Sequence, residues 1–216
     1  MDYGAFYERM ERELPTSTNF AASMSSLIDW LRQRVPHSDW NKLKELKFDE
    51  DLRIGKQWFQ QLVKEHPSDF DTRALYFGIS EEFGEETETG AYGPESADLY
   101  LVLFSEYDPN DASMDWIYGT NRFDFDEEQA KAHLPALKSI GLICNEEGSI
   151  GSDAYIALSV GFVVLLLKHI LSGGASIAPN IAQPVAVVTG FGSGDLFKLG
   201  DLTKDRLRLS RAMISK

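Results

Sequence analysis

Cysteine is nearly absent from the sequence: Cys144 is the only one among 216 residues, so no disulfide can form within the chain. Disulfides persist in oxidising compartments, and a chain without them fits the reducing cytoplasm, which is the location we expect. The apolar neighbours of Cys144 (Gly-Leu-Ile-Cys) favour a buried packing residue over a nucleophile. This cysteine and the histidines lack the spacing of zinc ligands, so we predict no metal site; the histidines are His37, His66, His133 and His169.

Basic residues are also scarce. The chain has 21 Lys and Arg against 34 Asp and Glu, which gives it a net charge of −13. Nucleic acids and anionic membranes would be repelled by this charge, so we expect neither as a partner. Residues 1–14 are charged throughout and lack the apolar region of a secretory signal peptide.

One apolar stretch dominates the sequence, between Ser152 and Gly174. Its uncharged part from Ala154 to Leu167 has fourteen residues, whereas a membrane span needs roughly 20. The apolar residues occupy all sides of the predicted helix, which is typical of a helix buried in a protein core. We therefore predict a central core helix, with Ser152 or Asp153 as its N-cap.

Apolar residues at helical spacing predict three helices before any strand. These helices cover residues 2–14, residues 20–35, and a stretch that begins at Asp49 or Asp51 and ends just before Pro67. Short aromatic and apolar runs then predict strands, which are Thr72–Ser80, Leu99–Tyr107, Trp116–Tyr118, Val185–Thr189 and Asp195–Leu199. The turn-forming run from Asp108 to Ser113 would join the second and third strands as a hairpin.

The remaining segments are less regular. Residues 126–140 have a helical pattern that Pro135 should shorten or kink. Leu142–Cys144 fits a short strand or a docked loop, and the tail from Thr203 to Ile214 fits a last short helix. Together these patterns favour an α+β fold with a mainly antiparallel sheet, a buried central helix and an N-terminal helical segment. We expect a single domain over residues 1–216, with a helical subdomain at 1–67 as the alternative.

Two loops resemble ligand sites but lack decisive residues. The glycine-rich run 190–195 follows a predicted strand, but another strand pattern follows it and the Lys-Ser/Thr pair of a phosphate loop is absent. A tight hairpin turn is favoured there, and we predict no bound cofactor. The oxygen-rich run 108–115 does not match a calcium loop, because Ser113 stands where glycine belongs and Gly119 where glutamate belongs.

The negative charge is concentrated in the middle of the chain. Residues 81–128 contain fifteen acidic residues and one basic residue, Arg122, so their net charge is −14 and the rest of the chain sums to +1. Aromatic residues are interleaved with the acids. Exposed aromatic side chains anchor partners and carboxylates steer them, so this composition suits the recognition of a basic protein.

We expect two loops to carry this recognition, because loops at strand ends are exposed and often carry function. The predicted partner-binding residues are Glu81, Glu82, Glu85, Glu86, Glu88, Asp108, Asp111, Asp115 and Trp116. The competing interpretation is a solvated acidic face whose aromatic side chains point into the core.

An enzymatic function remains the alternative. Paired carboxylates in a cleft near the glycine-rich hairpin would suit a small cytosolic hydrolase, but the sequence does not select a pair, so we assign no catalytic residue. The oligomeric state is left open, and a structural subunit that pairs through its apolar helix is a third hypothesis.

Two stretches resemble small cytosolic bacterial immunity proteins of polymorphic-toxin systems. They are Thr-Arg-Ala-Leu-Tyr-Phe-Gly from Thr72 and Gly-Ser-Gly-Asp-Leu-Phe-Lys-Leu-Gly at 192–200, in a chain that is acidic as those proteins are. The resemblance implies a non-enzymatic protein that binds and neutralises a toxin, often a basic nuclease. It carries no individual functional residue to this chain.

Overall fold

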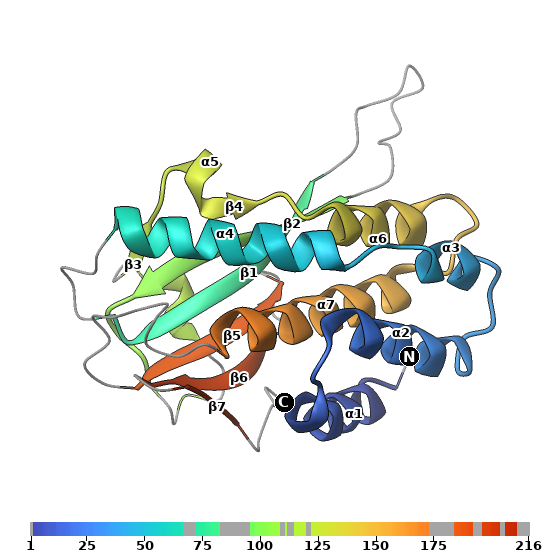
Figure 1. Ribbon diagram of the computed structural model, residues 1–216, viewed down its shortest axis with the longest axis horizontal. Coiled ribbons are helices and arrows are strands. Elements are labelled where there is room, and N and C mark those ends of the chain that lie inside the picture. Colours follow the sequence, from blue (N-terminus) through green and yellow to red (C-terminus); the bar gives the residue numbers. More distant parts are fainter. Residues whose placement is uncertain are drawn as a thin grey trace.

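The computed structural model describes residues 2–66, 72–82, 96–108, 111, 115–119, 122–172, 184–191, 196–203 and 206–210 (Figure 1). The α-helices are α1 (Tyr3–Thr16), α2 (Phe20–Arg32), α3 (Trp40–Lys44), α4 (Asp49–Glu65), α5 (Glu127–Ala130), α6 (Pro135–Asn145) and α7 (Ser152–Leu171). The strands are β1 (Ala74–Glu82), β2 (Ser96–Phe104), β3 (Arg122–Asp124), β4 (Lys131–Ala132), β5 (Val185–Phe191), β6 (Leu196–Leu202) and β7 (Leu207–Leu209). Residues Asp115–Tyr118 form a 3₁₀ helix, η1.

The strands form one mixed sheet in the order β3-β2-β1-β5-β6-β7, and β4 also pairs with β2. β1 and β5 are parallel, with Ala74 opposite Ala186. The other pairings are antiparallel, including β1 with β2 and β5 with β6. The predicted α+β fold, with its mainly antiparallel sheet and N-terminal helices, is confirmed.

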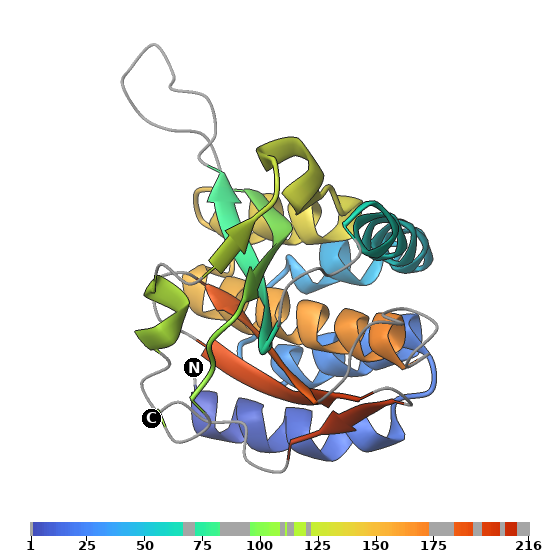
Figure 2. The same ribbon diagram turned by 90° about the vertical axis from the view of Figure 1, so that its left-hand side faces the viewer.

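Helices cover one face of the sheet (Figure 2). Because side chains alternate along a strand, every second residue of β1 points toward the helices. One of these residues is Phe77, whose ring centroid lies 5.7 Å from that of Phe59 on α4. Tyr155 of α7 contacts Phe191 of β5, and Tyr7 of α1 stacks on Phe197 of β6. The core that the helices share with the sheet therefore includes buried residues of β1, β2, β4, β5 and β6, with β2 in contact with α6.

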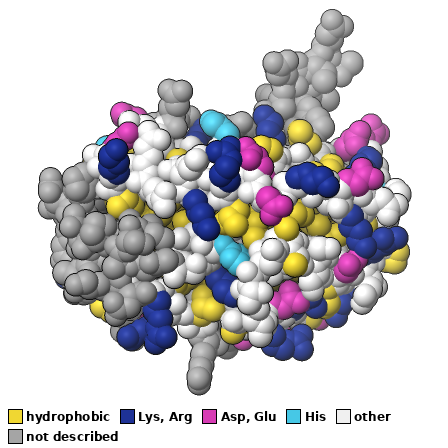
Figure 3. Space-filling view, viewed as in Figure 1, with side chains coloured by type: hydrophobic (Ala, Val, Ile, Leu, Met, Phe, Trp, Pro, Cys, Tyr) yellow, Lys and Arg dark blue, Asp and Glu magenta, His cyan; other side chains and the backbone are white. Residues whose placement is uncertain are grey.

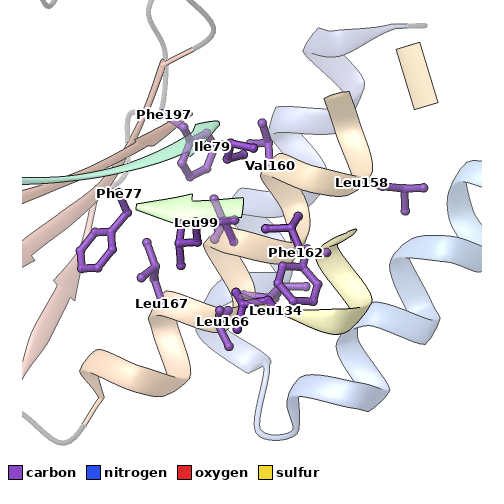
Figure 4. Packing of buried hydrophobic residues seen from close by; sticks show 14 of the residues in the cluster. Phe77, Ile79, Leu99, Leu134, Leu158, Val160, Phe162, Leu166, Leu167 and Phe197 are labelled. Atoms are coloured by element: carbon purple, nitrogen blue, oxygen red, sulfur yellow. The ribbon is translucent and has the colours of Figure 1, made fainter. Parts of the chain in front are cut away.

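The helix α7 lies at the centre of this core, as predicted. Five of its apolar side chains are at most 1% exposed; they are Val160, Phe162, Val163, Leu166 and Leu167. Figure 4 shows α7 side chains together with residues of the sheet, such as Phe77 and Leu99, and with Leu134, which precedes α6. Of the described helices, α7 alone is long and apolar enough to cross a membrane, but 83% of its most apolar window is buried, as in a core helix.

Close contacts fix α7 against the N-terminal helices. A Cβ atom at Gly161 would lie 2.4 Å from Leu27, so glycine lets α2 approach the backbone of α7. Phe162 packs edge-on against Phe20 at 5.3 Å between ring centroids. Near the C-terminal end of α7, Lys168 donates hydrogen bonds to the carbonyl oxygens of Leu14 and Ser17. The last carbonyl groups of a helix have no partner within it, so Lys168 supplies donors to the C-terminal end of α1. One cluster of buried side chains thus joins residues of the first four helices to α7 and the sheet.

Several element predictions were wrong. Trp116–Tyr118 is part of the 3₁₀ helix η1 rather than a strand, and the strand that pairs with the end of β2 is β3. Residues 126–140 are not one helix, because Lys131 and Ala132 pair with β2. Pro135 begins a new helix, α6, at a position where its missing N–H costs no hydrogen bond.

Four further corrections concern shorter segments. Leu142–Cys144 belongs to α6 and is not a strand. The tail contains the edge strand β7 where a helix was expected, since Leu207–Leu209 pairs with β6. The helix α3 was not predicted. Gly151 precedes α7, and no side chain caps it.

Replacing Leu166 with Ala should lower the free energy of unfolding by about 2–5 kcal/mol, because the lost side chain leaves a cavity in a packed core. Leu166 is 0% exposed and lies on the side of α7 that faces Gly55 of α4. Urea denaturation measures the change, and Leu142→Ala on α6 is the control because Leu142 is 38% exposed. Equal losses in the two variants would contradict the buried position of α7.

A buried carboxylate also links α4 to α6. Asp51 is 0% exposed, and its Oδ1 accepts a hydrogen bond from the backbone N–H of Ala136 at 2.9 Å. Its Oδ2 has no hydrogen-bond partner in the described part of the chain. Burial raises the pKa of Asp51 from 3.8 to about 6, although the backbone N–H groups of α6 partly oppose this shift. Asp51 therefore stays protonated to a higher pH in the folded protein than in the unfolded chain.

The raised pKa predicts a pH dependence of stability that Asp51→Asn should remove. Since the folded pKa of Asp51 exceeds the unfolded one, its contribution is fully present below about pH 4 and is lost as the pH rises through 6. Relative to Asp51→Asn, the wild-type chain should lose about 1–3 kcal/mol between these pH values. Urea titrations of both proteins from pH 4 to 7 measure this difference, and parallel stability curves would contradict it.

Candidate partner-binding surface

The two predicted acidic loops lie at opposite ends of the β1–β2 pair. Ala74 of β1 is opposite Phe104 of β2, and Glu81 is opposite Ala97. A strand rises about 3.3 Å per residue, which puts Ala74 and Glu81 about 23 Å apart. Asp108 follows the Phe104 end of β2, whereas Glu81 lies at the other end. Among the described residues, the acids of the two loops therefore lie at separate ends of the sheet and do not form one patch.

The described residues of the two ends differ in number. At one end, Glu81 is exposed and Glu82 ends β1, while Glu85, Glu86 and Glu88 lie outside the described residues. At the other end, Asp108 is exposed, Asp111 and Trp116 are half-buried, and Asp115 begins η1. The backbone N–H of Asp111 donates to the carbonyl of Asp108 at 3.2 Å. The other residues of the predicted hairpin turn lie outside the described residues. Only this second end has described geometry around its predicted residues.

A cleft of about 430 Å³ occupies this second end. It brings the predicted residues Asp108 and Trp116 together with Glu106, Tyr107 and Arg73. Glu106 and Asp108 are both exposed, so their carboxylates are accessible from solvent. The backbone N–H of Arg73 donates a hydrogen bond to the carbonyl of Phe104 on β2, and its carbonyl accepts one from the N–H of Ala186 on β5. These two hydrogen bonds anchor this side of the cleft to the sheet.

Trp116 is held in a fixed position within this cleft. Its ring packs edge-on against Phe104 at 5.0 Å and against Tyr107 at 5.3 Å. The indole Nε1 is buried and has no hydrogen-bond partner among the described residues. A buried donor without an acceptor is unfavourable, so the aromatic packing has to offset the cost of holding Trp116 in this position.

A second hollow, here called the tyrosine pocket, lies beside the cleft on the face of the sheet away from the helices. Its volume is about 330 Å³; its aromatic and charged lining includes Tyr76, Tyr100, Phe104, Tyr118, Arg122 and Asp124, and the rest of the lining is apolar. The Tyr76 hydroxyl donates to the carbonyl of Gly190 at 3.1 Å. Burial raises the pKa of Tyr76 far above its ordinary value, so this phenol stays protonated. At the mouth, Arg122 donates to Asp124 at 2.8 Å.

The strand sequence itself creates the floor of the tyrosine pocket. Tyr100 and Gly78 are opposite one another on β2 and β1. A Cβ atom at Gly78 would lie 2.1 Å from the ring of Tyr100, so only glycine lets this ring lie across β1. There it meets Tyr76 edge-on, with 5.8 Å between ring centroids. The two rings thereby form a continuous aromatic surface.

One pair of side chains resembles part of a catalytic site. Asp98 is 4% exposed, and its Oδ2 lies 3.1 Å from Nδ1 of His133, whose side chain is 71% exposed. When Nδ1 donates to a carboxylate in this way, Nε2 is free to accept a proton. The described residues contain no group of three His, Cys, Asp or Glu that could hold a metal ion.

The tyrosine pocket and the Asp98–His133 pair were not predicted from the sequence. Strand alternation could have revealed the pocket, since Tyr76 and Gly78 on one strand and Tyr100 and Val102 on the other occupy the same face. The opposite face of both strands is filled by Leu, Ile and Phe and is typical of a core. No local signal identifies Asp98 and His133 as neighbours, because they are 35 residues apart.

Comparisons of this chain with protein-family models, with curated proteins and with solved structures find no match.

Proposed function

We propose that this chain is a non-enzymatic binding protein whose acidic middle segment contacts a basic protein, such as the toxin that an immunity-type protein inhibits. The observation that carries the proposal is the cleft at the end of β2, where Glu106 and Asp108 flank the fixed ring of Trp116. Partner-binding hot spots commonly combine a buried aromatic anchor with a polar rim, and acidic groups at the rim select basic partners.

The distribution of charge supports contact through the middle segment rather than through the helical face. The helical face in Figure 3 carries basic and acidic side chains side by side, so it lacks a single sign of charge. Outside residues 81–128 the sequence is close to neutral. A basic partner is therefore attracted toward the middle segment, and within it the cleft adds an aromatic contact to the charge.

Charge reversal at the two ends separates direct contact from general attraction. A partner isolated by pull-down at low salt would be tested against Glu106→Lys/Asp108→Lys and, as a matched control, Glu81→Lys/Glu82→Lys. Both variants change the net charge equally. Charges are screened beyond about 8 Å at physiological ionic strength, and the two ends are about 23 Å apart. We expect the first variant to slow association and weaken binding at least tenfold, while the control changes binding little.

Surface plasmon resonance at low and physiological salt measures both rates. Circular dichroism melts verify that the variants remain folded, because exposed substitutions usually change stability by less than about 0.5 kcal/mol. Unchanged association in both variants at both salt concentrations would mean that the acidic residues form only a solvated face. A larger effect of the Glu81 variant would move the contact to the other end.

A hydrolase is the second candidate, and the Asp98–His133 pair favours it. A buried carboxylate that orients an exposed imidazole is the arrangement of a general base. If the chain is a binding protein, purified wild-type protein should hydrolyse chromogenic carboxyl and phosphate esters no faster than His133→Ala does. Turnover by the wild type that His133→Ala abolishes would replace the binding proposal with an enzymatic one.

A further inference from the structure

The lining of the tyrosine pocket is suited to a cation. The rings of Tyr76, Tyr100, Phe104 and Tyr118 contribute to its walls, and Tyr118 is 58% exposed at the rim. Aromatic rings carry partial negative charge on their faces, and they attract a cation that lies over them. The phenol oxygens add acceptors. A volume of about 330 Å³ accommodates one long side chain with room for its planar head group.

The charged groups at the mouth leave an acceptor available. Arg122 engages Oδ2 of Asp124 through its Nε, so the two charges largely cancel. The described contacts leave Oδ1 of Asp124 without a hydrogen bond, and a carboxylate accepts several. A second guanidinium can therefore bind this carboxylate from the pocket side. An anion would instead meet aromatic faces in a chain with a net charge of −13.

The planar shape of the pocket walls selects arginine over lysine. A guanidinium is flat, stacks on aromatic rings and donates two parallel hydrogen bonds to a carboxylate, whereas an ammonium is a compact, strongly hydrated charge. Tyr76 and Tyr100 meet edge-on at 87° and so offer a ring face and a ring edge at the floor. Trp116 in the neighbouring cleft packs on Phe104, which also lines the pocket. A partner that covers Trp116 therefore reaches the tyrosine pocket as well.

We propose that the tyrosine pocket binds one arginine side chain of the basic partner, stacked on its tyrosine rings and hydrogen-bonded to Asp124. This inference rests on the proposed function and adds the chemistry of the anchoring residue. It also defines a site that is measurable in the isolated protein.

The test uses N-acetyl-arginine amide as the probe and N-acetyl-citrulline amide, its uncharged analogue, as the control ligand. NMR titration of the tyrosine ring signals should show millimolar binding of the arginine probe and much weaker binding of the citrulline probe. Tyr118→Ala and Asp124→Asn should each weaken binding of the arginine probe roughly threefold to tenfold, as expected for one cation–aromatic or charged contact. Asp126→Asn is the matched control, because Asp126 is exposed and does not line the pocket.

Three results would overturn the inference: binding of neither probe, equal binding of both, or equal effects of Asp124→Asn and Asp126→Asn. Binding of N-acetyl-aspartate amide at the same site would overturn it too, since it would indicate an anion site. Each of these results is distinguishable from failure of the proposed function. A loss of partner binding in Glu106→Lys/Asp108→Lys would still support the cleft as the contact, with a different anchor.

Discussion

A helix that is apolar on all sides must be covered on all sides, and this constraint determines the layout of the chain. The sheet covers one side of α7 through residues such as Phe191, and α2, α4 and α6 cover the others. Gly161 allows the close approach of α2. Because this one face of the sheet is committed to the helices, the opposite face is where Tyr76, Tyr100 and Trp116 gather. The candidate binding surface thus follows from the burial of α7.

The antiparallel register of β1 and β2 has an equally direct consequence for function. Because the two strands are antiparallel, the acidic residues that follow β2 lie at one end of the sheet and Glu81 lies at the other. At the Trp116 end, aromatic rings and carboxylates come together in one cleft and an adjoining pocket. A run of acids that is continuous in the sequence is therefore divided in space, and only one of its parts has aromatic anchors among the described residues.

The fold was largely predictable where one physical signal dominated. The continuous apolar sequence identified α7, and apolar residues at helical spacing identified α1, α2 and α4. The aromatic run Thr72–Ser80 identified β1. The prediction failed where tertiary contacts decide, as at Trp116, which turns into η1 to pack on Phe104 and Tyr107. Pro135 was interpreted as a kink because the sequence does not reveal that β4 ends the preceding segment. Asp108 and Trp116 were predicted as site residues, whereas the tyrosine pocket depends on strand register, which composition does not specify.

The most direct test of the central claim is hydrogen–deuterium exchange of the chain with and without its partner. If the partner covers the cleft and the tyrosine pocket, backbone amides of residues 105–108 and 115–124 should exchange more slowly in the complex. Amides of Ser80 and Glu81 at the opposite end of β1, and those on the outer side of α2, should be unchanged. Slower exchange confined to the Glu81 end or to the helical face would contradict the account.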